Sequence, residues 1–243
     1  MPDDPLLRIH DLHVRYGKVE AVRGLSTSSA AGRVTLMLGA NGAGKSTTLR
    51  AAAGLVPVAS GDVLLGDRRM TPLAPHQVVR DGLVLVPEGR RVFAQLTVEE
   101  NLALGGYTAT RAMTAKALTR VFDLFPILHS RRTGPAGLLS GGEQQMLAFG
   151  RALMSAPRVM MLDEPSMGLA PMMVESVLGA VRPIADAGVG LLMVEQNADI
   201  GLEVADEVVV VARGEVVFSG GAEQARTNAS VVRAFLGEAA LAP

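Results

Sequence analysis

The sequence predicts an α/β fold that has a mostly parallel sheet and a large helical insertion. Short apolar runs of strand length alternate with helical segments along most of the 243 residues. The alternation stops between about residues 97 and 155, where several helical patterns follow one another without an apolar strand. The sequence shows no internal repeat and no low-complexity linker. We therefore expect residues 1–243 to form one domain with a full hydrophobic core.

Six apolar runs have the length of buried strands and define the expected sheet. They are residues 6–9, 34–38, 83–86, 159–162, 190–194 and 207–211. Ligands of parallel α/β sheets bind at the carboxyl ends of the strands. Polar residues that directly follow these runs are therefore the candidates for a functional site.

The helical region has its own start signal. Thr97 and Glu100 have the spacing of a capping box, and apolar residues recur at helical intervals from Leu118 to Phe125. A short helical tail is expected at residues 231–236, close to the end of the sequence.

Composition excludes several classes of protein. The net charge is −1, and no basic run is long enough to form a nucleic-acid stripe, so no nucleic-acid partner is expected. Apolar runs such as residues 208–212 fall far short of the roughly 20 residues of a membrane-spanning helix. The absence of cysteine excludes disulfides, thiolate metal sites and a cysteine nucleophile. Residues 1–5 lack a signal-peptide pattern, which indicates a cytosolic chain.

Residues 39–47 fit the phosphate-loop pattern G-x-x-x-x-G-K-[ST], between a strand run and a helical segment at residues 48–53. In such a loop, glycines let backbone N–H groups converge on phosphate oxygens, Lys45 reaches the β and γ phosphates, and Ser46 gives a hydroxyl to Mg²⁺. A glycine-rich turn that binds nothing is disfavoured, because strand, loop, Lys-Ser pair and helix are all in register. The candidate nucleotide ligands are Gly39, Asn41, Gly42, Gly44, Lys45, Ser46 and Thr47.

Two adjacent carboxylates, Asp163 and Glu164, follow the apolar run at residues 159–162. At a strand end beside a phosphate loop, Asp163 can hold Mg²⁺ and Glu164 can orient or deprotonate the attacking water. Acidic residues also end strands simply to reach solvent, but the phosphate loop favours the functional interpretation.

The segment Leu-Ser-Gly-Gly-Glu at residues 139–143 opens another helix, which is expected to end near residue 155. Ser140 and Glu143 have capping-box spacing, so a helix start without any ligand is one interpretation. Gly141 and Gly142 are poor helix formers, which favours a second interpretation, that a phosphate approaches this backbone closely.

In this order and spacing, residues 39–47, 139–145 and 158–165 resemble the Walker A, signature and Walker B motifs of ABC ATPases. The resemblance covers residues 7 to about 217. It implies a P-loop NTPase (RecA-like) core with an antiparallel β subdomain and a helical insertion, the ABC cassette. On this pattern, residues 1–87 and 157–243 form the nucleotide-binding core, and residues 88–156 form the helical subdomain with the signature motif.

The resemblance also implies ATP and Mg²⁺ as cofactors and a site shared by two cassettes. The phosphate loop of one cassette then faces the signature segment of the other, with Ser140, Gly141 and Gly142 as nucleotide contacts. Tyr16, in Val-Arg-Tyr-Gly, matches the aromatic residue that stacks on adenine. A strand-end tyrosine packed on the core is the alternative.

Three positions depart from the commonest pattern of this family. Glu88 stands where glutamine usually senses Mg²⁺ and water, although a carboxylate can also ligate Mg²⁺. Gln196 stands where a histidine usually contacts the γ-phosphate, and it cannot become cationic. Ala170 stands where aspartate is common. Glu164, Gln196 and Glu88 are the candidate catalytic residues, and Ser46, Asp163 and Glu88 the candidate metal ligands.

The wording of residues 86–93, 96–102, 166–171 and 194–197 resembles one of the two ATPases of bacterial branched-chain amino-acid importers. The three departures then look like subfamily features. The resemblance implies a subunit on the inner face of the cell membrane, and it implies these partners: a second ATPase subunit (a paralogue or a second copy), two transmembrane permeases and, indirectly, a solute-binding protein. ATPases for urea, amides or other hydrophobic amino acids, exporter or lipopolysaccharide-type ATPases, and soluble ABC ATPases acting on ribosomes or DNA are the alternatives.

The loop after Glu88 is the expected docking surface for the permease. It offers Arg90, Arg91, Val92, Phe93 and Leu96 before the helix start at Thr97. Exposed apolar residues in such a loop indicate a partner surface. The alternative is that Val92, Phe93 and Leu96 pack inward as the hinge of the helical insertion.

Overall fold

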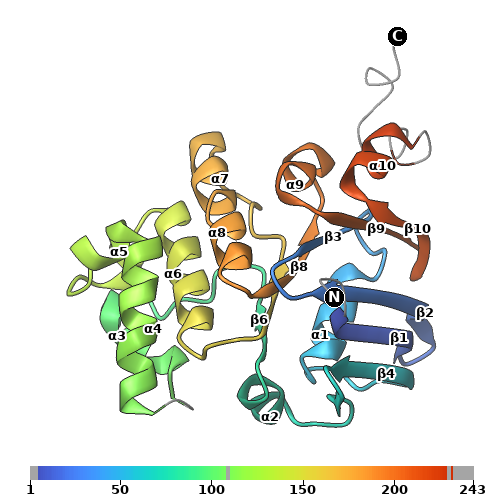
Figure 1. Ribbon diagram of the computed structural model, residues 1–243, viewed down its shortest axis with the longest axis horizontal. Coiled ribbons are helices and arrows are strands. Elements are labelled where there is room, and N and C mark those ends of the chain that lie inside the picture. The colour runs from blue at the N-terminus through green and yellow to red at the C-terminus, as the bar shows by residue number, and fades with distance from the viewer. Residues whose placement is uncertain (1–4, 108–109, 229–230, 232–243) are drawn as a thin grey trace.

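A computed structural model describes residues 5–107, 110–228 and 231, and these residues form two sheets and a set of helices (Figure 1). The elements in chain order are β1 (Pro5–Tyr16), β2 (Val19–Ala30), β3 (Val34–Leu38), α1 (Lys45–Ala52), β4 (Ser60–Leu65), β5 (Arg68–Arg69), α2 (Pro75–Arg80), β6 (Leu83–Val86), α3 (Val98–Gly105), α4 (Arg111–Leu124), α5 (Pro126–Ser130), the 3-10 helix η1 (Ala136–Leu138), α6 (Gly141–Leu153), β7 (Val159–Asp163), α7 (Pro171–Leu178), α8 (Val181–Asp186), β8 (Gly190–Glu195), α9 (Ala198–Val204), β9 (Glu207–Ala212), β10 (Glu215–Gly221) and α10 (Ala222–Thr227).

The central sheet has the order β10-β9-β3-β8-β7-β6. All its pairs are parallel except β10 with β9. The predicted mostly parallel sheet is therefore confirmed, and five of the six expected strands lie in it. The sixth, at residues 6–9, exists but belongs to β1 of the other, antiparallel sheet. Since β3, β6, β7 and β8 run in the same direction, the segments that follow them meet at one edge of the sheet.

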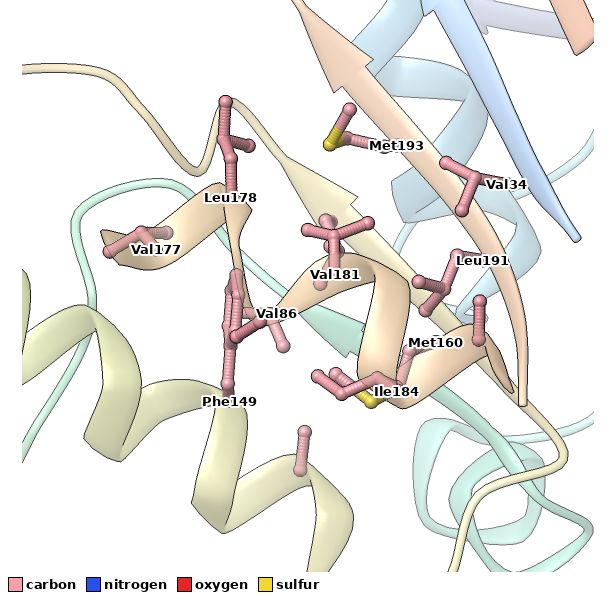
Figure 2. Close-up of a cluster of buried hydrophobic side chains, with 14 of the residues drawn as sticks. Val34, Val86, Phe149, Met160, Val177, Leu178, Val181, Ile184, Leu191 and Met193 are labelled. Atoms are coloured by element: carbon pink, nitrogen blue, oxygen red, sulfur yellow. The ribbon is translucent and has the colours of Figure 1, made fainter. Parts of the chain in front are cut away.

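The central strands are buried on both faces, which explains why they read as continuous apolar runs. Along β7, Val159 and Met161 pack with α1 and the antiparallel sheet, whereas Met160 and Leu162 pack with α6, α7 and α8. Figure 2 shows part of the core on the side of α6, α7 and α8, in which Phe149 of α6 lies near Val177 and Leu178. This core fixes the sheet against the helices that carry candidate site residues.

The second sheet is antiparallel, with the order β2-β1-β4-β5. Its presence was expected from the family resemblance, but the apolar runs located only residues 6–9 of β1 and missed β2, β4, β5 and β10. These strands are half-buried and carry many polar residues, and bulges interrupt the alternation, for example between Ile9 and Leu12 of β1. A strand search based on apolar runs cannot detect such segments.

The region between β6 and β7 is helical, as predicted. Its first helix, α3, begins with the expected capping box, since Thr97 N–H donates to Glu100 at 2.8 Å and Glu100 N–H donates to the Thr97 hydroxyl at 3.1 Å. Helices α3–α6 lie together on one side of the central sheet (Figure 1). The helical tail expected at residues 231–236 lies outside the described residues, apart from Val231.

Asp206, the residue before β9, connects the beginning of β3 to α8 through hydrogen bonds. Its carboxylate accepts hydrogen bonds from Val34 N–H at 2.8 Å and from Arg182 at 3.0 Å. Burial alone would raise the pKa of Asp206, but these hydrogen bonds outweigh it and hold the pKa below its usual value. In the part of the chain that the structure describes, no helix is long and apolar enough to cross a bilayer.

Candidate active site

A cavity of about 540 Å³ lies where the segments after β3, β6, β7 and β8 meet. Its lining brings together most of the candidate residues from distant parts of the sequence: Tyr16, Asn41, Gly42, Gly44, Lys45, Ser46, Thr47, Glu88, Glu164 and Gln196, together with Ala21, Ala43 and Met167. The strand-end argument therefore predicted correctly that these residues lie together at one edge of the sheet.

The phosphate loop leads directly into α1, which begins at Lys45 rather than at Thr48 as expected. Gly44, the residue before the helix, has φ +106°, and a Cβ there would lie 2.5 Å from the carbonyl oxygen of Ala21. Only glycine fits this position. No side chain caps this helix start, so no side-chain acceptor competes with an anion for the first-turn N–H groups.

Lys45 is buried, with 4% of its side chain exposed. Its ammonium donates to the carbonyl oxygens of Gly39 at 2.6 Å and Ala40 at 3.2 Å, and it lies 3.8 Å from a carboxylate oxygen of Glu164. A single cation therefore joins the two ends of the phosphate loop to the end of β7. This position places the charge at the cavity wall.

Ser46 and Asp163 form a site that fits a magnesium ion. The Ser46 hydroxyl donates to Asp163 Oδ1 at 2.7 Å, while Asp163 Oδ2 is buried and has no hydrogen-bond partner. Burial raises the pKa of Asp163, with the hydrogen bond from Ser46 opposing it. Among the described residues no group of three or more Asp, Glu, His or Cys side chains could hold a metal. An ion here would therefore take its other ligands from phosphate and water, as Mg²⁺ commonly does.

Glu164 is held in a left-handed conformation with φ +48°, and its N–H donates to the carbonyl oxygen of Val194 at 3.0 Å. This bond fixes the Glu164 backbone to β8, so its side chain lines the cavity. Burial raises the pKa of Glu164, and the nearby Lys45 ammonium partly opposes that rise. A carboxyl group with a raised pKa beside a phosphate site is suited to accept a proton from water.

Tyr16 is 47% exposed and lines the cavity, so the alternative that it packs on the core is wrong. Glu88 and Gln196 also line the cavity. The cavity lining contains no histidine. No imidazole in the cavity lining therefore takes over the contact that a histidine usually makes from the Gln196 position.

Comparisons with known proteins agree with this geometry. The sequence pattern of the family described as ABC transporter matches residues 22–167. The chain belongs to the ABC transporter family. It is 40% identical over 232 residues to the high-affinity branched-chain amino acid transport ATP-binding protein BraG of Pseudomonas aeruginosa, covering 96% of this chain and 100% of that protein. It is 36% identical to the probable branched-chain amino acid transport ATP-binding protein LivF of Archaeoglobus fulgidus, covering 90% and 93%.

The solved structures lead to the same family. The ADP conformation of an ATP-binding cassette of an ABC transporter superposes with a TM-score of 0.86 at 26% identity, covering 97% of this chain and 100% of that chain. The chain is thus an ABC ATPase with a P-loop NTPase core, an antiparallel sheet and helical insertion, as the sequence predicted, and ATP is its nucleotide.

The signature segment of this ABC ATPase does not line the cavity. Ser140 caps α6, with its N–H donating to Glu143 at 2.6 Å, so the capping-box interpretation is confirmed. The glycines have neighbours within the chain: a Cβ on Gly141 would lie 3.2 Å from the Arg90 guanidinium, and one on Gly142 would lie 2.5 Å from Met173 Sδ. Packing within the chain is therefore a second reason for glycine at these positions, and the close approach of a phosphate to this backbone stays a prediction.

Two residues near the site make contacts that were not predicted from the sequence. Glu195, the last residue of β8, is 2% exposed and accepts hydrogen bonds from Ser166. Arg90 was expected on the docking surface, but its guanidinium donates to the carbonyl oxygen of Gly168 at 3.2 Å and lies against Gly141. Glu195 follows an apolar run as Asp163 does, so the strand-end rule could have found it. No sequence signal pointed to the contacts of Arg90 with Gly168 and Gly141.

Proposed function

We propose that this ABC ATPase powers the uptake of branched-chain amino acids through partner permeases, on the cytoplasmic face of the cell membrane. The observation that carries this proposal is the 40% identity to BraG over nearly the whole of both chains. Glu88 and Gln196 depart from the commonest family pattern, but both line the proposed nucleotide cavity, so the departures do not remove these positions from the site.

We infer that the chain works as one of a pair of cassettes, with a paralogue or a second copy as the other. Ser140, Gly141 and Gly142 are absent from the lining of the cavity that holds the phosphate loop. A signature segment outside its own chain's cavity is suited to meet the nucleotide of a partner. In this arrangement, residues 1–87 and 157–243 are the nucleotide-binding core and residues 88–156 the helical subdomain.

Each residue of the cavity has a proposed role in ATP hydrolysis. The phosphate loop from Gly39 to Thr47 and the Lys45 ammonium hold the phosphates, and Tyr16 stacks on adenine. Mg²⁺, when bound, neutralises phosphate charge and is held by Ser46 and Asp163, with Glu88 beside it. Glu164 orients the attacking water and accepts its proton, while Gln196 donates a hydrogen bond to the γ-phosphate.

The permease docking surface is a groove of about 320 Å³ between β6, α3 and α6. Of the five residues expected at this surface, only Phe93 lines the groove. The other lining residues include Val84, Leu85, Val86, Pro87, Leu104, Tyr107, Ala148, Arg151 and Ala152. Phe93, Leu104 and Tyr107 are 52%, 46% and 63% exposed, so an apolar surface of three large side chains borders the groove.

The exposure of Phe93 is fixed by its backbone. The buried Asn101 side chain accepts from Phe93 N–H at 2.9 Å and donates to the Phe93 carbonyl oxygen at 3.0 Å. The Arg151 guanidinium lies 5.5 Å from the centre of the Phe93 ring. The alternative of an inward hinge is thus wrong for Phe93, whereas Val92 does pack against the core. An aromatic ring held outward beside a cation is a suitable anchor for an apolar helix of a permease.

Replacing Phe93 with Asp is expected to abolish co-purification of the chain with its permease while ATP binding stays unchanged. A carboxylate at the groove removes the apolar anchor and would be desolvated by a bound helix. Pull-down of the permease measures the effect, and thermal melting confirms folding. Val217→Asp on β10, which is 61% exposed and outside the groove, is the matched control. A folded Phe93→Asp chain that still retains the permease would place the docking surface elsewhere.

Uptake of labelled leucine tests the substrate. Cells that carry the chain with its neighbouring permease and binding-protein genes are expected to take up leucine, and the uptake should disappear when only this chain is deleted. Unlabelled isoleucine and valine should compete, whereas urea and acetamide should not. Leucine uptake that survives the deletion, together with lost urea or amide uptake, would move the chain to one of the related transporters. If deletion of this chain abolishes none of these uptake activities, a soluble or exporting ABC ATPase is favoured.

A further inference from the structure

The carboxylate of Glu195 binds Ser166 with both of its oxygens, and the Gln196 backbone N–H also donates to it. Oε1 accepts a hydrogen bond from Ser166 N–H at 2.9 Å, and Oε2 accepts one from the Ser166 hydroxyl at 2.8 Å. Glu195 is the end of β8, whereas Ser166 lies in the turn after β7, 29 residues earlier. A single side chain therefore fastens the turn after β7 to the end of β8.

This fastening lies between two proposed catalytic residues. Ser166 is two residues after Glu164, and Glu195 directly precedes Gln196. Glu164, Ser166, Glu195 and Gln196 together line a hollow of about 240 Å³ next to the nucleotide cavity. The backbone hydrogen bond from Glu164 N–H to the Val194 carbonyl oxygen also joins the ends of β7 and β8. The turn that carries Glu164 is therefore joined to the end of β8 both through its backbone and through the Glu195 side chain.

Packing alone does not explain a glutamate at this position. Glu195 is 2% exposed, and a buried carboxylate is costly to desolvate even when it is hydrogen-bonded. An apolar residue of similar length would fill the space at the end of a buried strand at least as well. The benefit of the carboxylate is directional, because it dictates where Ser166 N–H and hydroxyl must lie.

We propose that Glu195 is a positioning residue for ATP hydrolysis, which acts through Ser166 to set the distance between Glu164 and Gln196. The inference rests on the roles proposed above for these two residues. The attacking water must be held by Glu164 on one side and the γ-phosphate by Gln196 on the other. A misplacement of about 1 Å between such groups can cost a hundredfold in rate. Nucleotide binding depends mainly on the phosphate loop, whereas the side-chain hydrogen bonds of Glu195 go to Ser166.

Glu195→Met tests the proposal, because it keeps the length of the side chain and removes both acceptors. In the assembled transporter, kcat for ATP is expected to fall roughly tenfold to hundredfold, while KM and the ATP affinity of the purified full chain stay within about twofold. Glu195→Gln should recover most of the rate, since its amide can accept from Ser166 N–H and donate to the hydroxyl. Glu207→Met, on an exposed strand end of β9, is the matched control and should leave kcat unchanged.

A double-mutant cycle separates this role from a general loss of structure. Ser166→Ala alone should lower kcat about threefold to tenfold, and adding it to Glu195→Met should lower kcat little further, because both changes break the same link. Ser176→Ala, an exposed serine on α7, controls for the serine substitution. Losses that multiply, a KM that rises in proportion to the loss of rate, or a folded Glu195→Met chain with normal kcat would each overturn the proposal.

Two further cases have defined outcomes: a Glu195→Met variant that does not stay folded, and a wild-type assembly that does not hydrolyse ATP. If Glu195→Met melts below the assay temperature, Ser166→Ala decides by itself: a lower kcat at unchanged KM supports the proposal, and an unchanged kcat overturns it. Absence of hydrolysis in the wild-type assembly would instead contradict the proposed function. Normal wild-type turnover with an unaffected Glu195→Met variant would contradict only the positioning role.

Discussion

Replacing Lys45 with Ala is expected to lower ATP hydrolysis in the assembled transporter by at least about 100-fold. The Lys45 ammonium is the cation that lies between the phosphate loop and Glu164, and it is bonded to both Gly39 and Ala40 carbonyl oxygens. Its removal takes the point charge away from the proposed position of the β and γ phosphates. It also leaves the partly buried Glu164 carboxylate without the cation that lies 3.8 Å from it.

Hydrolysis is measured as phosphate release, and ATP binding to the purified chain is measured in parallel. Lys116→Ala, on the exposed side of α4, removes the same charge far from the cavity and should keep wild-type turnover. Thermal melting shows whether Lys45→Ala still folds. Turnover close to wild type in a folded Lys45→Ala chain would rule out the proposed phosphate site.

Glu164→Gln is expected to keep ATP binding and to lower turnover by about 10²–10⁴-fold. The substitution preserves the shape of the side chain and the backbone bond to Val194, but an amide cannot accept a proton from the attacking water. The expected pattern is therefore an ATP affinity within about threefold of wild type and a collapse of kcat.

Single-turnover hydrolysis and equilibrium ATP binding measure the two parts of this prediction. Glu175→Gln replaces an exposed carboxylate on α7 and is the control for loss of a negative charge near the loop after β7. If ATP binding is lost together with turnover, Glu164 has a structural or metal-binding role. If turnover stays normal, another residue orients the water.

Most of the cavity was predictable because its residues follow strands. The phosphate loop, Asp163 and Glu164 each come directly after a fully buried run, and the parallel direction of β3 and β7 then forces them to one edge of the sheet. Ser46 and Asp163 are 117 residues apart and yet share a hydrogen bond of 2.7 Å. The antiparallel strands were not found in the apolar pattern, because they are half-buried and interrupted by bulges.

The sequence by itself determined the family, the nucleotide and the central sheet, since these depend on local chemistry: glycines beside a lysine, and apolar runs that end in carboxylates. Only the tertiary structure decided how single side chains are directed. It placed the Arg90 guanidinium against Gly168, held Phe93 outward through Asn101, and joined Glu195 to Ser166. Such directions arise from the packing of segments that are distant in the chain, and sequence spacing carries no information about that packing.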